Sequence, residues 1–358
     1  MDVQAIDHIE LYVGDAEEEA ARLCDSFGFT VHGRGGPETG LTDCRSVLLR
    51  QGEIALLLTS ALGASHRAAE YVRRHGDGVA VIAFSVEDAH TAFAEAVERG
   101  AAALAPPQDL GPDDERVTFA SVNGFGDVEH RFASRSRSDG RFAPGIIEEI
   151  VPPPGRDGLL TAVDHIAVCL PAGGLLAAVR RYVEVFGFTQ TFEEKIVVGS
   201  QAMDSKVVQS LSGKVTFTIM EPDTTRDPGQ IDEFVRSHDG PGVQHIAFLT
   251  DDITAAVRAG EERGVRFLRT PAGYYDDLPA RLGPIGVGVA TLRELNVLAD
   301  RDYFGIMLQI FTESRHGRRT LFYELIDRRG ARTFGSNNIK ALYEAVDRQR
   351  AADAAART

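Results

Sequence analysis

Cysteine is scarce in this chain. Only three of its 358 residues are cysteines, namely Cys24, Cys44 and Cys169, and they are widely separated. An odd number of dispersed cysteines argues against a disulfide framework and favours a reducing compartment. None of them stands in a CxxC pair beside a histidine, so a closed, cysteine-rich structural zinc site is not expected.

Long apolar runs are also missing. Although 43% of the residues are hydrophobic, no run approaches the roughly 20 residues that a membrane-spanning helix needs. The opening sequence MDVQAIDHIELYV alternates like a strand, and it lacks the basic start and apolar stretch of a signal peptide. These features predict a cytoplasmic protein.

Positive charge is in deficit, with 38 Lys and Arg against 53 Asp and Glu and a formal net charge of −15. Such a chain repels phosphate backbones, which argues against a nucleic-acid partner. The short basic stretch from Arg315 to Arg319 is interpreted as a solvated loop. The glycines of GPIGVGVA (residues 283–290) are not placed between a strand and a helix, so a dinucleotide site is not supported either.

The chain repeats itself. IDHIELYV near Asp7 and VDHIAVCL near Asp164 are each followed by a helix-like segment that ends in FGF. A second pair of matching segments starts at Asp77 and at Pro241. Each unit begins with apolar residues at every second position and continues with apolar residues at three- and four-residue spacing. We expect four such strand-and-helix modules, each completed by further strands.

The repeat divides the chain into two halves. Residues 136–158 are polar, carry Pro and Gly and lack periodicity, so they are predicted to link an N-terminal domain (1–135) to a C-terminal domain (159–358). Near the end, one helical face of Ile339, Leu342, Tyr343 and Val346 follows a capping region at Ser336 and Asn337. This helix either packs on the core or forms a lid over a site, and both interpretations remain open.

Two histidines and one carboxylate mark the repeat-equivalent strands of the C-terminal half. His165 stands in DHIAV, His245 in QHIAF and Glu324 in LFYELIDR, at nearly equal intervals. A 2-His-1-carboxylate face holds Fe(II) and leaves positions open for a substrate and O2. The other interpretation is two ordinary buried histidines, but an acid inside an apolar strand needs a partner. We therefore predict that His165, His245 and Glu324 are catalytic metal ligands.

The N-terminal half serves as an internal control. There His8 matches His165, whereas Val81 matches His245 and Arg131 matches Glu324. An arginine cannot bind a cation. The N-terminal site is thus predicted to be degenerate, with His8 as a core or interface histidine and one iron per chain.

These motifs resemble the 4-hydroxyphenylpyruvate dioxygenases and the related 4-hydroxymandelate synthases over nearly the whole chain. The resemblance rests on VDHIAV, VVQS, GPGVQHIAF, RTPAGYYDDL, LQIFT, LFYELIDRRG and FGSNNIKALYEAV, which occur in the family's order. It implies an α+β vicinal-oxygen-chelate fold, with four βαβββ modules in two half-open barrels. It also implies Fe(II), O2 and a 2-oxo acid substrate, with a homodimer as an open possibility.

The resemblance also carries a substrate pocket over to this chain. Gln230 and Gln309 match pocket glutamines, and Ser205 matches a serine near the polar end of the substrate. Phe311, Phe322 and Phe334 fit an aromatic wall, although Phe322 fits ordinary core packing equally well. The full set expected to bind the substrate comprises Ser205, Thr218, Gln230, Gln309, Phe311, Phe322, Phe334, Asn338 and Ile339.

Two departures from the dioxygenase pattern bear on the product. Thr218 and Met220 stand where the dioxygenases usually carry Pro and Asn, and Ile339 replaces a Phe. Both resemble the synthase branch, which implies benzylic hydroxylation to 4-hydroxymandelate, as used in antibiotic biosynthesis, and not ring hydroxylation to homogentisate.

A ring-cleaving dioxygenase and a metal-free binding module are more distant possibilities for a chain of this kind. The LQIFT segment and the C-terminal motif argue against the ring-cleaving enzyme. A module that only binds a small hydrophobic compound has no need for His165, His245 and Glu324 together, so the triad argues against it.

Overall fold

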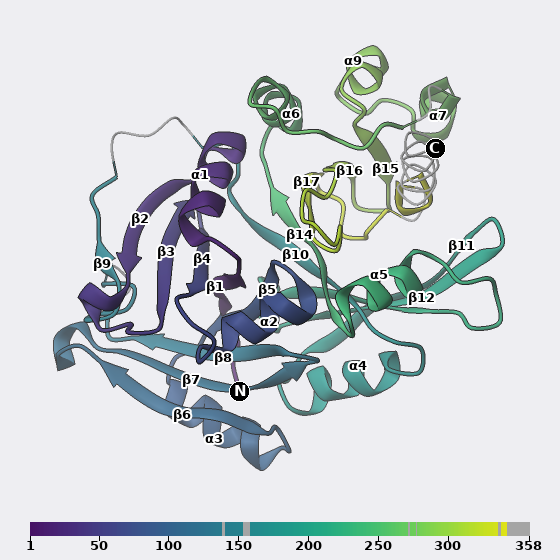
Figure 1. Ribbon diagram of the computed structural model, residues 1–358. Coiled ribbons are helices and arrows are strands. Elements are labelled where there is room, and N and C mark those ends of the chain that lie inside the picture. Colours follow the sequence, from purple (N-terminus) through teal and green to yellow (C-terminus); the bar gives the residue numbers. More distant parts are fainter. Residues whose placement is uncertain (138–139, 153–157, 271–272, 277, 336–337, 342–358) are drawn as a thin grey trace.

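The computed structural model describes residues 1–137, 140–152, 158–270, 273–276, 278–335 and 338–341. Two large mixed sheets, one from each half of the chain, form its framework, and helices cover their outer faces (Figure 1). Leu342, Tyr343, Val346, Ser336 and Asn337 lie outside the described residues, so the lid remains a prediction.

The first sheet belongs to the N-terminal half. Its strands follow the order β6 (Ala103–Leu110), β7 (Val117–Phe125), β8 (Val128–Arg135), β5 (Gly78–Ser85), β1 (Ala5–Tyr12), β4 (Ile54–Ala61), β3 (Cys44–Gln51), β2 (Thr30–Gly35) and β9 (Glu148–Glu149). Strand β9 comes from the segment predicted to be a linker, and it pairs with the edge strand β2.

The second sheet repeats this plan in the C-terminal half. Its order is β11 (Thr189–Val198), β12 (Gln201–Gln209), β13 (Thr216–Pro222), β10 (Ala162–Cys169), β14 (Gly242–Leu249), β17 (Phe322–Arg329), β16 (Ile306–Phe311) and β15 (Leu298–Arg301). In both sheets an antiparallel pair at the centre, β1 with β5 and β10 with β14, joins two four-stranded modules. The four βαβββ modules predicted from the repeat are confirmed.

Helices connect the strands within and between modules. They are α1 (Ala16–Phe27), α2 (Arg67–His75), α3 (Ala89–Glu98), α4 (Leu175–Glu184), α5 (Gln230–His238), α6 (Ile253–Glu262), α7 (Gly273–Asp276), α8 (Leu278–Leu282) and α9 (Val289–Glu294), with 3-10 turns η1 (Pro37–Thr39) and η2 (Asp113–Glu115). Helix α1 shows why the boundaries fall where they do. The Asp15 side chain accepts from the first free N–H groups, and Gly28 ends the helix at φ 80°, a conformation that glycine adopts without strain.

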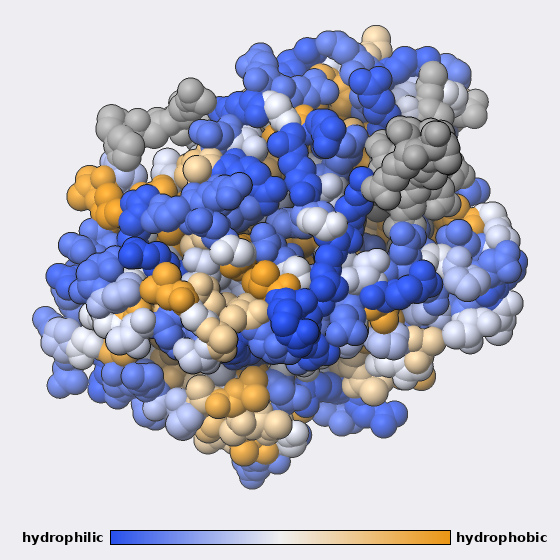
Figure 2. All heavy atoms as spheres, viewed as in Figure 1, coloured by the Kyte–Doolittle hydropathy of each residue, from blue (hydrophilic) through white to orange (hydrophobic). Residues whose placement is uncertain are grey.

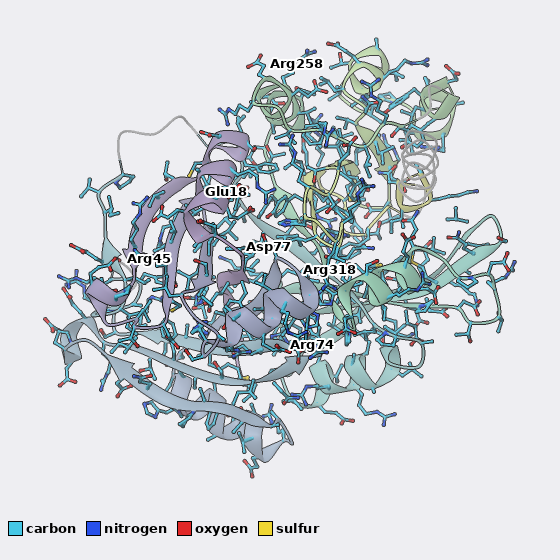
Figure 3. The ribbon with its side chains drawn as sticks, in the orientation of Figure 1. Glu18, Arg45, Arg74, Asp77, Arg258 and Arg318 are labelled. Atoms are coloured by element: carbon cyan, nitrogen blue, oxygen red, sulfur yellow. The ribbon has the colours of Figure 1, made fainter. Side chains whose placement is uncertain are left out.

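The two halves contact each other through helices α1, α2 and α5 and the loop between β16 and β17. His75 on α2 stacks on His238 on α5, with ring centroids 4.4 Å apart. Figure 3 shows Arg74 and Arg318 at this junction, where Arg74 pairs with Asp239 at 3.3 Å and Arg318 donates to the Arg73 carbonyl at 2.9 Å. The basic loop predicted to be solvated is thus exposed at Arg315 and Arg318, yet it also ties the halves together.

The surface in Figure 2 is mostly hydrophilic, with small, scattered apolar spots. Such isolated apolar side chains are normal on folded proteins. Within the described residues, no helix has the length and apolar character required to cross a membrane.

Candidate metal centre

Three adjacent strands bring the predicted triad together. His165 on β10 lies opposite Ala247 on β14, and Ala247 in turn lies opposite Glu324 on β17. His245 is two positions before Ala247 on the central strand, so its side chain projects from the same face. The repeat spacing thus places all three side chains on one patch of the sheet.

The functional atoms of the triad converge. The Nε2 atoms of His165 and His245 each lie 3.3 Å from the same oxygen, Oε2 of Glu324. All three residues are buried, with exposed fractions of 4%, 7% and 1% for His165, His245 and Glu324. A buried carboxylate and two imidazoles with one open side form a donor set that suits a divalent transition metal.

Neighbouring side chains fix the tautomer of each histidine. Nδ1 of His165 lies 2.7 Å from Asp164 Oδ1, and Nδ1 of His245 lies 3.2 Å from Gln244 Oε1. Because these oxygens accept the Nδ1 proton, Nε2 is the nitrogen that each ring directs at the centre and can offer to a metal ion. Arg328 holds Asp164 in turn, at 2.6 Å from Nε to Oδ2.

Two β-bulges explain why adjacent residues reach the same site. The pairing of β10 with β14 is irregular between Val163 and His165, and again opposite Gln244. Regular alternation would send Asp164 and Gln244 to the opposite face from His165 and His245. The bulges allow each of them to contact its neighbouring histidine.

Charge at the centre shifts the titration of the triad. Burial alone would lower the pKa of His165, but the carboxylates of Glu324 and Asp164 outweigh it and raise that pKa to about 9. For His245 burial prevails, and its pKa is lowered. Burial would raise the pKa of Glu324, yet the two histidines hold it down at about 2. In the metal-free protein a proton on His165 therefore balances part of the negative charge.

A chain of side-chain hydrogen bonds supports Glu324 from behind. Gln309 Nε2 donates to Glu324 Oε1 at 2.6 Å, and Asn338 Nδ2 donates to Gln309 Oε1 at 2.8 Å. The Tyr274 hydroxyl donates to Asn338 Oδ1 at 2.6 Å. Since Oε1 is engaged by Gln309, only Oε2 of Glu324 faces the two histidines.

The triad lies in the wall of a cavity of about 520 Å³, part of which is open to solvent. Six of the nine residues predicted to bind the substrate line it, namely Ser205, Thr218, Gln309, Phe311, Phe334 and Ile339. Met220, noted in the sequence as a departure from the dioxygenase pattern, also lines it. Sequence reasoning did not single out the other four lining residues, Phe192, Glu194, Val207 and Gln244. Among the described lining residues there is no lysine or arginine.

The other three predicted residues lie elsewhere. Gln230 starts α5 and lines a separate small cavity near Met203. Asn338 is fully buried behind Gln309. Phe322 stacks on the His245 ring at 4.9 Å, so it supports a triad residue and does not line the cavity itself.

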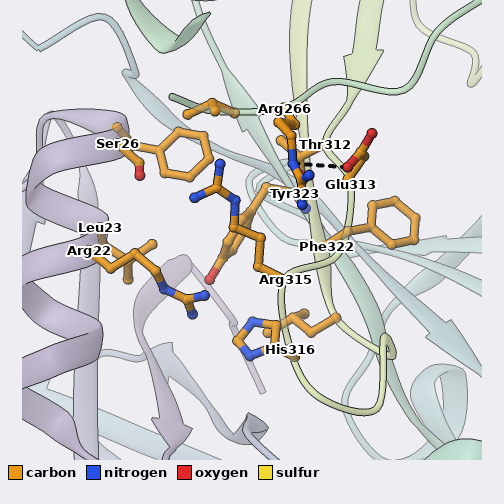
Figure 4. A pocket seen from close by; sticks show the side chains of 13 residues that line it. Arg22, Leu23, Ser26, Arg266, Thr312, Glu313, Arg315, His316, Phe322 and Tyr323 are labelled. Carbon is orange, nitrogen blue, oxygen red and sulfur yellow. Dashed lines mark hydrogen bonds and ion pairs between the residues drawn. The ribbon is translucent and has the colours of Figure 1, made fainter. Parts of the chain in front are cut away.

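A different cavity lies on the other side of strand β17, between α1 and the β16–β17 loop (Figure 4). Tyr323 lines it, whereas the next residue along the strand, Glu324, belongs to the triad cavity. Arg266 pairs with Glu313 there at 3.1 Å. Phe322 lines this cavity as well, and none of the described residues lines both cavities. The two cavities are therefore distinct.

The N-terminal counterpart of the triad holds a cation of its own. Arg131 on β8 lies opposite Ala83, as Glu324 lies opposite Ala247. Its guanidinium lies 3.3 Å from His8 Nε2, 3.0 Å from Glu10 and 2.8 Å from Glu129. Burial and the Arg131 charge lower the pKa of His8. Among the described residues, no group of three metal-ligating side chains converges here, because the Arg131 guanidinium lies between His8, Glu10 and Glu129.

Comparison with known proteins agrees with this architecture. Residues 5–127 and residues 164–278 each match the Glyoxalase/Bleomycin resistance protein/Dioxygenase superfamily. The chain is 35% identical to the 4-hydroxyphenylpyruvate dioxygenase of Danio rerio over 357 residues, which cover 95% of this chain and 89% of the relative. It is 33% identical to that of Dictyostelium discoideum over 364 residues, with coverage of 97% and 98%. The chain belongs to the 4-hydroxyphenylpyruvate dioxygenase family.

Among solved structures, a triple mutant of 4-hydroxymandelate synthase from Streptomyces coelicolor superimposes with a TM-score of 0.89. It is 46% identical, and the match covers 98% of this chain and 100% of the other. The predicted α+β vicinal-oxygen-chelate fold and the resemblance to this family, closer to its mandelate synthase branch, are confirmed.

Proposed function

We propose that this protein is an Fe(II)-dependent 4-hydroxymandelate synthase, which converts 4-hydroxyphenylpyruvate and O2 into 4-hydroxymandelate and CO2. The observation that carries the proposal is the convergence of His165 Nε2 and His245 Nε2 on Glu324 Oε2, each at 3.3 Å, in the wall of a mostly apolar cavity. The donor set fits iron because two imidazoles and one carboxylate on one face are the ligands of non-haem Fe(II) oxygenases.

The residues around the triad would hold the iron and leave room for reactants. His165, His245 and Glu324 would each supply one ligand atom, since Gln309 engages the second oxygen of Glu324. Bound iron would activate O2 and accept the 2-oxo acid as a chelate on its open positions. With iron bound, Asp164 and Gln244 would accept the Nδ1 protons of the two imidazoles and leave each Nε2 to the ion.

The cavity walls favour a substrate that binds through its 2-oxo acid group. The described residues that line the cavity include no lysine or arginine that could pair with the substrate carboxylate. The negative charge of that carboxylate would therefore be neutralised at the triad, by the bound metal ion. Phe311, Phe334 and Ile339 offer apolar surface for the aromatic ring. Glu194 and Ser205 lie opposite each other on β11 and β12. There the Glu194 carboxylate would accept a hydrogen bond from the phenol hydroxyl, and the Ser205 hydroxyl would donate one to the phenol oxygen.

The shape of the wall at Ile339 supports the mandelate product. Ile339 is smaller than the phenylalanine that the dioxygenase pattern carries there, and it lines the cavity. A smaller wall lets the ring turn aside so that the benzylic carbon comes closest to the reacting centre. The 46% identity to a 4-hydroxymandelate synthase, against 35% to the dioxygenase of Danio rerio, points the same way.

The test is a product analysis. Protein loaded with Fe(II) under anaerobic conditions is given 4-hydroxyphenylpyruvate and then O2, and the products are separated and identified by mass against authentic standards. We expect 4-hydroxymandelate, with one CO2 released per O2 consumed. Homogentisate would instead identify the protein as a 4-hydroxyphenylpyruvate dioxygenase. If no oxygen is consumed, both the proposed substrate and the proposed metal are wrong.

A further inference from the structure

A second group of metal-ligating side chains lies in the N-terminal sheet, away from the degenerate site at His8. Asp43 is the last residue before β3, Cys44 is the first residue of that strand, and His66 immediately precedes α2. One ligand atom from each lies within 4.8 Å of the others. In the part of the chain that the structure describes, only this group and the triad of His165, His245 and Glu324 meet that condition. We propose that Asp43, Cys44 and His66 bind a divalent metal ion of borderline softness, zinc above all.

The fold brings these residues together from two separate turns. Strands β3 and β4 are antiparallel, with Cys44 opposite Ala61. The Leu62 N–H donates to the Asp43 carbonyl at 2.8 Å, which extends the pairing beyond the strand ends. The chain then turns through residues 62–65 and places His66 beside the Asp43 and Cys44 pair.

The donor chemistry favours zinc. A thiolate, an imidazole and a carboxylate are the three kinds of protein ligand that zinc uses, at about 2.0 to 2.3 Å. When the Cys44 thiol loses its proton on binding, the set carries two negative charges, which neutralise the ion. Three protein ligands leave a fourth tetrahedral position for water.

Access to the site is open on one side. Cys44 is only 3% exposed, whereas Asp43 and His66 are half-buried. An ion can therefore reach the two outer ligands from solvent before it meets the thiol. The triad, by contrast, contains no sulfur, so a sulfur-specific signal distinguishes the two sites.

Metal binding would also act on helix α2. Nδ1 of His66 accepts a hydrogen bond from the Ala68 N–H at 3.2 Å and so caps this helix. Coordination through Nε2 would place the ring proton on Nδ1 and exchange this long bond for a metal bond. The bound ion would then tie the first turn of α2 to the start of β3, and it would stabilise the folded state by mass action.

The experiment uses the full-length protein, freed of metal with a chelator and titrated with Co²⁺ without oxygen. We expect an intense thiolate-to-cobalt charge-transfer band that reaches a plateau during the titration and that Zn²⁺ removes. The triad of His165, His245 and Glu324 can take up a second Co²⁺, but it gives no such band because it contains no sulfur. Cys44→Ser should abolish the band, whereas Cys24→Ser, at a half-buried cysteine outside the group, should retain it. Circular dichroism checks that both variants fold.

Two further variants decide whether the other ligands take part. His66→Gln and Asp43→Asn should each weaken cobalt binding by more than about tenfold, while Glu324→Ala should leave the band unchanged. Absence of a charge-transfer band in the parent protein would overturn the site. A band that survives in Cys44→Ser, or undiminished affinity in His66→Gln, would overturn it as well.

Discussion

Each half of the chain holds a histidine in the same arrangement of Asp, His, Arg and Phe. The members are Asp7, His8, Arg135 and Phe142 in the N-terminal half and Asp164, His165, Arg328 and Phe334 in the C-terminal half. In both halves the Asp accepts from Nδ1, and the Phe ring packs edge-on against the imidazole, at 4.9 Å for His8 and 5.2 Å for His165. The arrangement therefore does not depend on a metal ion.

The two halves differ in what faces Nε2 of that histidine. In the C-terminal half it is the Glu324 carboxylate, which raises the pKa of His165 to about 9. In the N-terminal half it is the Arg131 guanidinium, which contributes to lowering the pKa of His8. The Arg131 guanidinium thus lies beside Nε2 of His8 and neutralises Glu10 and Glu129. The two halves thus differ by Arg131 in place of Glu324 and Val81 in place of His245. These two differences distinguish the candidate metal centre from the ion-pair cluster at His8.

Removing the carboxylate should have the largest effect. Glu324→Ala leaves two histidines without their shared anion, so we expect Fe(II)-dependent turnover to fall by at least about 1,000-fold. Oxygen consumption with 4-hydroxyphenylpyruvate measures this loss, and Glu294→Ala at an exposed ion pair is the control. Full activity in Glu324→Ala would remove this residue from the proposed ligand set.

Removing the internal cation should destabilise the N-terminal half. Arg131→Met leaves Glu10 and Glu129 buried without their shared partner, and loss of one partner of a buried pair costs about 3–5 kcal/mol. Urea unfolding measures the change, with Arg45→Met at an exposed pair as the control, where we expect less than about 1 kcal/mol. Equal losses in both variants would contradict a special role for Arg131.

The metal affinity of the triad should depend on pH. Because the metal-free His165 keeps its proton up to a pKa of about 9, an incoming ion must displace that proton. Affinity should therefore rise with pH, by up to about tenfold per unit between pH 7 and 9, and then level off. Calorimetry in buffers of different ionisation enthalpy measures the released proton. Uptake of metal without proton release would contradict the charge balance described above.

Weakening the hydrogen bond that supports one histidine should affect metal binding in one half of the chain only. Asp164→Asn removes the charged acceptor of the His165 Nδ1 proton, and such outer contacts change metal affinity by about 10–100-fold. Asp7→Asn makes the same change beside His8 and should leave metal affinity unaltered. An equal effect of both variants on metal binding would mean that Asp164 acts through the fold and not through His165.

The smallest change concerns product choice. Ile339→Phe restores the larger side chain of the dioxygenase pattern in the cavity wall, so part of the product should shift from 4-hydroxymandelate to ring-hydroxylated compounds. Chromatography with mass detection gives the ratio, and Val207→Ile at another lining position controls for a general change in volume. An unchanged ratio would exclude Ile339 as a determinant of the product.

Sequence patterns predicted the parts of this architecture that repeat. Period-two apolar strands and the doubled DHI segments were enough to predict four modules, and the convergence of His165, His245 and Glu324 follows from their equivalent strand positions. Degeneracy of the N-terminal site was predicted from Val81 and Arg131, because neither side chain can bind a cation.

Features set by tertiary geometry could not be predicted in this way. Gln244 reaches the cavity only because a bulge interrupts the alternation of β14, and no sequence signal marks that bulge. Gln230 shares its motif context with pocket residues, yet helix α5 places it beside another cavity. Phe322 and Asn338 contact His245 and Gln309 from outside the cavity, since the direction of a side chain depends on its partners across the sheet.

The most direct test of the difference between the halves is a crystal structure of the Fe(II)-loaded protein, with anomalous scattering recorded at the iron absorption edge. One iron peak between His165, His245 and Glu324, and none beside His8 and Arg131, is the predicted result. A peak at His8, or the lack of one at Glu324, would contradict the account.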